Sequence, residues 1–315
     1  MEIAVKELLD YHSLEHPLKL KLVSGIRGIE KKITTNSINR PGLNLFGFYD
    51  NFVPERVQIF GRGEAAFLVK LVKEQNLENI KKFFTFDIPC CIFSHDFELP
   101  KDVKDISEAA GIPVLNTGMS TAMLIHNIEQ FFAFEAAPRT TIHGVMIEVF
   151  GIGILLTGES GVGKSECALE LIERGHRLIS DDVVDIRLLP NNMLMGYGSK
   201  LIKHHMEIRG VGIINIAHLF GVGVVRESKQ INMIIHLENW DENKQYDRLG
   251  LEDEYEEILG EKITRLVIPV QPGRNIPIII ETASMNYRLK TMGYHPAKEF
   301  NNMITSLIER GEEIY

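Results

Sequence analysis

The glycine-rich segment from Gly158 to Ser165 carries the residues best suited to chemistry. It fits the phosphate-binding pattern G-x-x-x-x-G-K-[ST] at every defined position. Glycines allow the backbone to wrap closely around phosphate oxygens and to aim several N–H groups at them. Lys164 can reach the β- and γ-phosphates, and the Ser165 hydroxyl can be a ligand of Mg²⁺. The segment therefore predicts a nucleotide or polyphosphate site made of Gly158, Glu159, Ser160, Gly161, Val162, Gly163, Lys164 and Ser165.

The residues on either side of this loop predict the elements that position it. Ile152 to Leu156 is an apolar run typical of a buried strand, and Lys164 to Arg174 has the apolar stripe of a helix. Gly175 is placed to end that helix. A strand, a glycine loop and a helix N-terminus together form an anion-binding site.

Two adjacent carboxylates follow the next short apolar run. Arg177 to Ile179 is followed by Ser180, Asp181 and Asp182. Phosphoryl transfer needs one acidic group to orient Mg²⁺ and another to accept the proton of the nucleophile. Neighbouring side chains on an extended segment point to opposite sides, so these two should play different parts. The residues alone also allow a helix cap or a solvated turn.

A second charged motif lies in the segment Met206 to Asn215. Glu207 and Arg209 would share one side of an extended segment, and the glycines that follow let the backbone pass close to another group. A glutamate here could hold the metal and an arginine could stabilise the moving phosphoryl group. A charged edge strand followed by a turn explains the same residues equally well. His143, just before a predicted strand, is read by itself as a strand-end histidine.

Bulk composition limits the classes of protein. The chain has 315 residues, 44% of them hydrophobic and 24% charged, which is ordinary for a globular protein of two domains. A net charge of −9 argues against a sequence-independent nucleic-acid binder. Neither a signal peptide nor a stretch of membrane-span length is recognisable, so we expect a cytoplasmic protein without a membrane partner. Three cysteines, two of them adjacent, are interpreted as buried free thiols.

Residues 1–133 alternate helical and strand-like segments and predict a small α/β domain with a mostly parallel sheet and no assigned role. His95 beside Asp96 is interpreted there as a hydrogen-bonded surface pair. Periodicity is interrupted at Phe134 to Thr141, so residues 134–315 are predicted to form the phosphate-loop catalytic domain.

Several classes of phosphate-loop protein can be compared. A GTPase needs Asn-Lys-x-Asp to read guanine, and Asn243-Lys244-Gln245-Tyr246 lacks the carboxylate. Motor and transporter ATPases usually place their acidic strand further along the chain. A kinase keeps its acids close to the loop, as this chain does with Asp181 and Asp182. A regulatory module that hydrolyses ATP and a kinase of a small molecule remain as alternatives.

Taken together, these segments resemble one family, the bacterial HPr kinase/phosphorylases. The motifs cover most of residues 142–275 in order, and the run Glu207-Ile208-Arg209-Gly210 is far more specific than the phosphate loop. The resemblance is carried by Gly158 to Ser165 with Glu166, His143-Gly144, Asp181-Asp182, Glu207 to Asn215, Arg248, and Pro269 to Arg274.

The resemblance implies a bifunctional, Mg²⁺-dependent protein serine kinase. It would phosphorylate a regulatory serine on the phosphocarrier HPr from ATP or pyrophosphate, and would remove that phosphate with inorganic phosphate, forming pyrophosphate. It also implies a catalytic fold like phosphoenolpyruvate carboxykinase, a homohexamer, effectors such as fructose 1,6-bisphosphate, and a role in carbon catabolite regulation.

The family's roles can be placed on matching residues of this chain. Asp182 would accept the serine proton and donate it in reverse. Ser165 and Glu207 would hold Mg²⁺, and the Pro269 to Arg274 segment would matter most for dephosphorylation. The candidate catalytic residues are His143, Lys164, Asp181, Asp182, Arg209, Arg248 and Arg274.

Overall fold

The computed structural model describes residues 2–11, 16–199, 203–246 and 253–309. Its backbone contacts divide the chain into two compact units, Met1–Ala136 and Ala137–Tyr315. Among the helices of the described ranges, none combines the length and apolar composition required to cross a membrane. Cys90, Cys91 and Cys167 are all buried free thiols, as the sequence predicted.

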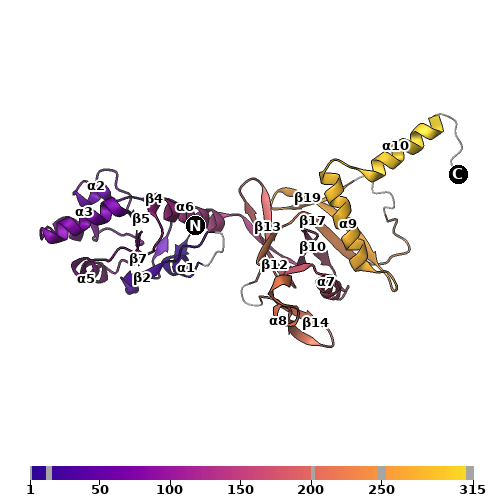
Figure 1. Cartoon of the computed structure of the whole chain (residues 1–315), viewed down its shortest axis with the longest axis horizontal. Helices are drawn as coiled ribbons and strands as arrows, with labels where there is room; N and C mark the ends of the chain where they lie inside the picture. Colours follow the sequence, from indigo (N-terminus) through magenta and orange to yellow (C-terminus); the bar gives the residue numbers. More distant parts are fainter. Residues whose placement is uncertain (1, 12–15, 200–202, 247–252, 310–315) are drawn as a thin grey trace. The chain divides into compact units, whose positions relative to one another are not determined.

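The first unit is built on a five-stranded sheet in the order β2-β7-β6-β5-β4, which Figure 1 shows in indigo and purple. β4 to β7 run parallel and only β2 is antiparallel, which confirms the predicted mostly parallel sheet. The elements are β1 (Ile3–Ala4), α1 (Val5–Leu9), β2 (Lys21–Ser24), η1 (Ile26–Gly28), β3 (Lys32–Ile33), β4 (Ile38–Asn39), α2 (Gly42–Leu45), β5 (Val57–Phe60), α3 (Arg62–Lys73), α4 (Glu78–Phe83), β6 (Cys91–Phe93), α5 (Lys101–Ala110), β7 (Val114–Asn116) and α6 (Thr121–Ala136).

Helices cover both faces of this sheet, so the unit has two apolar cores. One core packs α3, α4 and α5 on the strands, and the other packs α1 and α6. The hydroxyl of Ser120 accepts a hydrogen bond from the Met123 amide at 3.3 Å and so caps the start of α6. The His95 ring pairs with the Ser94 hydroxyl at 2.8 Å, so its predicted pairing with Asp96 is wrong.

The second unit is organised around a six-stranded sheet in the order β11-β9-β10-β17-β19-β18. β9 and β10 form an antiparallel hairpin, while β10, β17 and β19 run parallel. The elements are β8 (Arg139–His143), β9 (Val145–Val149), β10 (Ile152–Gly158), α7 (Lys164–Glu173), β11 (Arg177–Ser180), β12 (Val183–Leu189), β13 (Met193–Gly198), β14 (His205–Ile208), β15 (Gly212–Asn215), α8 (Ile216–Phe220), η2 (Val222–Val224), β16 (Ser228–Gln230), β17 (Met233–Asn239), β18 (Glu254–Ile258), β19 (Glu261–Val270), α9 (Ile276–Thr291) and α10 (Pro296–Glu309).

Different layers cover the two faces of this sheet. α7 and α9 lie on one face, over a core that includes Ala168, Leu171 and Ile280. A four-stranded sheet, β16-β13-β12-β8, packs on the other face through residues such as Val184 and Ile186. The unit thus has α/β/β layers. Because β10, β17 and β19 run parallel, their carboxyl ends lie at the same edge of the six-stranded sheet.

Two segments near the chain's later part can be compared with the sequence pattern. The pattern predicts a helix over Ser284 to Lys290, which is confirmed as part of α9, and α9 also takes in the apolar run Ile276 to Glu281. Phe220 to Val225 is typical of a glycine-rich turn into a strand, but Val222 to Val224 form the short 3₁₀ helix η2.

Gly153 lets the four-stranded sheet of the second unit pack closely on its six-stranded sheet. A Cβ at this position would lie 1.9 Å from the carbonyl oxygen of Gln230 on β16. The amide of Gly153 also donates to the Asn232 side chain at 2.9 Å. Both contacts hold the start of β10, the strand that leads into the phosphate loop.

We therefore expect Gly153→Ala to destabilise the second unit by at least ~1–3 kcal/mol, because the blocking atom is backbone and has little room to move. Denaturant unfolding followed by circular dichroism measures this change. Gly223→Ala is the control, since nothing lies within 4 Å of its Cβ. Equal stability of the two variants would contradict the close approach.

Candidate active site

The phosphate loop joins β10 to α7, as the sequence predicted. Gly158, Gly161 and Gly163 have φ values of 139°, 88° and 98°, which are conformations open to glycine and strained for other residues. The ammonium group of Lys164 folds back over the loop and donates to the carbonyl oxygens of Gly158 and Glu159 at 2.9 and 2.8 Å. The loop thus has the wrapped backbone and the adjacent cation that phosphate binding requires.

Asp181 connects the loop to the rest of the site. One carboxylate oxygen accepts the Ser165 hydroxyl at 2.8 Å, and the other accepts the Glu207 amide at 3.2 Å. The side chain belongs to a residue only 5% exposed. Burial raises the pKa of this carboxyl, and the bonds from Ser165 and Glu207 partly oppose that rise. Asp181 is therefore a buried acid at the end of β11, directed at the loop serine.

The hairpin of β14 and β15 brings the second charged motif to the loop. Met206 and Ile208 are buried in the core, while Glu207 and Arg209 lie on the exposed side of the strand, as their alternation predicted. The Arg209 guanidinium donates to the Ser160 hydroxyl at 3.3 Å. The structure thus places Arg209 over the phosphate loop and Glu207 next to Asp181.

Asp182 faces solvent, in contrast with its neighbour. It adopts a φ of 67°, and its carboxylate lies 3.9 Å from Nδ1 of His143. The side chains of Asp182 and His143 are 74% and 84% exposed. Pairing of β8 with β12 sets His143 opposite Val183 and so brings it beside Asp182. The two adjacent carboxylates therefore have different environments, as predicted.

Two predicted site residues, Arg274 and Arg248, remain to be placed. Arg274 donates to the carbonyl oxygen of Pro269 at 3.0 Å, which braces the turn between β19 and α9. Arg248 lies outside the described residues.

The sequence interpretation did not single out His236, whose Nδ1 pairs with the Thr157 hydroxyl at 3.0 Å just before the loop. Burial first, and then the positive charge of Arg265, lower the pKa of His236. A polar residue inside the apolar run of β17 was the signal that marked it.

The oxygen donors near the loop fit a Mg²⁺ ion. Mg²⁺ is usually held by one or two carboxylates together with substrate phosphates and water. The Ser165 hydroxyl and the carboxylates of Asp181 and Glu207 are donors of this kind. Within the described ranges, no group of three or more His, Cys, Asp or Glu residues is close enough to hold a metal by itself. This donor set suits a metal that arrives with phosphate.

The strand, the glycine loop and the buried acid that bonds the loop serine define a phosphate-loop domain of the nucleotide-binding type. Family models match both units. The HPr Serine kinase N terminus matches residues 3–132, and the HPr Serine kinase C-terminal domain matches residues 135–304. The chain belongs to the HPr kinase/phosphorylase family and is an enzyme of that kinase class.

Curated relatives extend over nearly the whole chain. The HPr kinase/phosphorylase of Leptospira biflexa is 50% identical over 98% of this chain and 95% of its own length. That of Bacillus subtilis is 43% identical over 99% of both chains. A solved structure of the Hpr(Ser) kinase/phosphatase from Coxiella burnetii is 36% identical, with a TM-score of 0.46, and covers 51% of this chain and 98% of its own.

The bonds of Asp181 lead to a measurable expectation. Asp181→Ala should speed hydrogen exchange at the Glu207 amide by about 10- to 100-fold, since a bond to a charged acceptor contributes roughly 1.5–3 kcal/mol. Exchange mass spectrometry of a peptide covering residues 203–209 provides the measurement. Asp182→Asn is the matched control, because its exposed carboxylate contacts His143 and not β14. Unchanged exchange in Asp181→Ala would mean that other contacts hold the hairpin.

Proposed function

We propose that this chain transfers a phosphoryl group from ATP or pyrophosphate to a serine of HPr, and that it removes this group with inorganic phosphate, forming pyrophosphate. The observation that carries the proposal is the bond between Asp181 and Ser165, because it links the phosphate loop directly to the adjacent, exposed Asp182. The kinase and phosphorylase names of relatives that match the whole chain support the same reading.

The exposure of Asp182 suits a protein substrate. A serine on the surface of another protein must reach the acceptor, and a carboxylate that is 74% exposed is open to it. In the forward direction Asp182 takes the proton of the serine hydroxyl as the oxygen bonds to phosphorus and the nucleotide or phosphate leaves. An aspartate is sufficient when the proton is lost late, as in a loose transition state. His143 lies beside this carboxylate and orients it.

The reverse direction uses the same groups. An oxygen of inorganic phosphate attacks the phosphorus of phosphoserine, the bond to the serine oxygen breaks, and protonated Asp182 returns the proton. Lys164 and Arg209 stabilise charge on the transferred group. Mg²⁺, held by Ser165, Glu207 and Asp181 with the phosphates, would neutralise charge on the phosphate oxygens.

Further family properties are part of this proposal. We infer a cytoplasmic homohexamer that responds to sugar phosphates such as fructose 1,6-bisphosphate. Three buried free thiols are consistent with a reducing compartment. Light scattering of the purified chain tests the assembly, and transfer assays with and without the sugar phosphate test the response.

A transfer assay tests the central proposal. Purified HPr is incubated with this chain and with ATP labelled in the γ-phosphate, and then with excess phosphate. Label should appear on a serine of HPr and then pass to pyrophosphate. Label found only as free phosphate would instead identify an ATP-hydrolysing module, and label on a metabolite would identify a small-molecule kinase.

Asp182→Asn should lower transfer in both directions by about 10²–10⁴-fold, the usual contribution of a positioned acid or base. Asparagine tolerates the positive φ of this position, so the backbone is kept. Nucleotide binding, measured by calorimetry, should stay unchanged because the loop is intact. Substantial kinase activity in this variant would rule out Asp182 as the base.

Arg274→Ala should impair phosphate-driven dephosphorylation more than ATP-driven phosphorylation. Free phosphate lacks the tether that holds the γ-phosphate of ATP in the loop, so it depends more on a nearby cation. Initial rates in the two directions give the comparison. Equal loss in both would assign Arg274 to the turn itself, which its bond to Pro269 supports structurally.

A further inference from the structure

A cavity of about 430 Å³ begins at the phosphate loop and continues between α7 and the start of α9. Its volume is within the usual range of roughly 300–1,000 Å³ for small-molecule pockets. It lies at the carboxyl ends of the parallel strands β17 and β19, where open α/β sheets bind ligands. Its lining residues are Val162, Gly163, Glu166, Cys167, Glu170, Leu237, Val270, Gly273, Arg274, Asn275, Ile276 and Pro277.

The chemistry of the lining is divided between an apolar floor and a polar rim. Leu237, Val270 and Ile276 supply apolar surface from two strand ends and the start of α9. Burial raises the pKa of the Cys167 thiol to about 12, so this side chain adds uncharged surface to the lining. The polar rim consists of Glu166 and Glu170 on α7 and of Arg274 and Asn275 before α9. Such a lining suits a flat ring with polar substituents.

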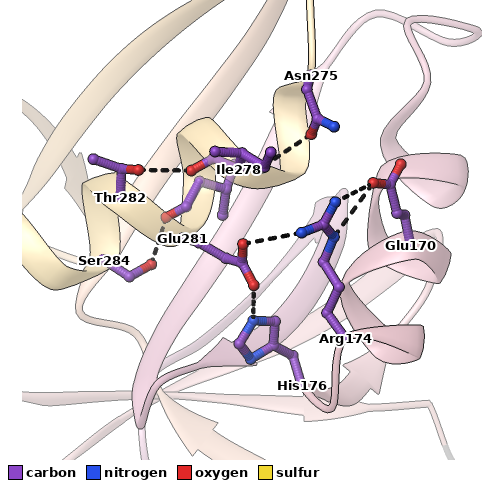
Figure 2. A network of polar contacts seen from close by, with 9 residues as sticks. Glu170, Arg174, His176, Asn275, Ile278, Glu281, Thr282 and Ser284 are labelled. Atoms are coloured by element: carbon purple, nitrogen blue, oxygen red, sulfur yellow. Dashed lines mark hydrogen bonds and ion pairs between the residues drawn. The ribbon is translucent and has the colours of Figure 1, made fainter.

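Two rim side chains are already fixed in orientation, as Figure 2 shows. Arg174 donates through Nε and Nη2 to one oxygen of Glu170, at 3.3 and 2.7 Å, which leaves the other oxygen as an acceptor. The Asn275 oxygen accepts the Ile278 amide at 3.1 Å and leaves its NH₂ group as a donor. Neither remaining atom has another partner within the described part of the chain. These two side chains therefore offer one acceptor and one donor.

A polar network holds the two walls of the cavity together. Glu281 of α9 accepts from Arg174 at 3.4 Å and pairs with the ring of His176 at 2.9 Å (Figure 2). His176 is 5% exposed and Glu281 has a largely buried side chain, so water screens these contacts weakly. The spacing of α7 and α9 is thus fixed before a ligand arrives.

We propose that this cavity binds the nucleoside part of the phosphoryl donor. With the phosphates in the loop, the base lies over Leu237, Val270 and Ile276, the ribose hydroxyls donate to Glu170, and the Asn275 amide donates to an acceptor on the base. This proposal depends on the proposed function, since it assigns a subsite of the same centre. Pyrophosphate has no nucleoside and occupies only the loop, so its binding does not depend on filling the cavity.

The stacked pair of Trp240 and Tyr246 is the rival place for the base. The two rings lie 5.0 Å apart at 28°, so one face of Trp240 is already covered. Trp240 is 42% accessible to solvent and Tyr246 is half-buried. The cavity is the better site because it is concave and continuous with the phosphate loop at Gly163.

Glu166→Trp tests the proposal by filling the cavity from an exposed helix position. The KM for ATP should rise about tenfold or more, as expected when a main contact surface is lost. The KM for pyrophosphate should change by no more than about twofold, the usual limit for a surface substitution. Glu173→Trp is the control, because it places the same side chain at an exposed α7 position, two turns beyond Glu166, that does not line the cavity. Equal losses with both donors would overturn the proposal, as would no loss with ATP.

Photolabelling of the unmodified chain with 8-azido-ATP gives an independent measurement. Labelled peptides should contain residues 162–170 or 273–277, and excess ATP should prevent the labelling. Label on Trp240 or Tyr246 would move the base to the rival site and overturn the assignment. Failure of the proposed function is distinguishable, because the unmodified chain would then transfer phosphate to HPr from neither ATP nor pyrophosphate.

Discussion

The two hydrogen bonds of the Asp181 carboxylate determine the geometry of the catalytic unit. A carboxylate withdrawn from water is costly unless donors satisfy it, and here the donors are the Ser165 hydroxyl and the Glu207 amide. One belongs to the phosphate loop and the other to the β14–β15 hairpin. Satisfying a single buried charge therefore fixes the loop, the end of β11 and the hairpin relative to one another. Arg209, two residues after Glu207, donates from the same hairpin to Ser160 of the loop.

Sheet topology makes this convergence possible. Because β10, β17 and β19 are parallel neighbours, the loop after β10 and the turn after β19 end at the same edge. α7 and α9 start from these two connections and pack on the same face of the sheet. The helices start from strands on either side of β17, and the cavity lies between them at the ends of β17 and β19. The network of Arg174, His176 and Glu281 connects the end of α7 to α9 across that gap.

The sequence predicted what local spacing determines and missed what distant contacts determine. The glycine loop, its strand and its helix follow one another within a short segment, so residue types and periodicity were sufficient. The alternation of Glu207 and Arg209 was equally local. The continuous α9 depends on packing against α7. The cavity combines residues 162–170 with residues 270–277, and one sequence carries no signal for such distant contacts. The bond of His95 to Ser94 likewise follows from backbone with positive φ that propensity does not predict.

The contrast between Asp181 and Asp182 explains why the catalytic unit needs its second sheet. Continuing the extended backbone of β11 would turn the second carboxylate to the opposite side, but the positive φ of Asp182 reverses the chain into β12. A non-glycine residue in this region is strained, and it persists because the amide of Gly144 bonds the Asp182 carbonyl oxygen at 2.9 Å. The pairing of β8 with β12 supplies that bond and also places His143 beside the carboxylate. The second sheet thus holds an exposed acid next to a buried one. The buried carboxylate bonds the loop serine, and the exposed one is the acid that meets an incoming hydroxyl in the proposed function.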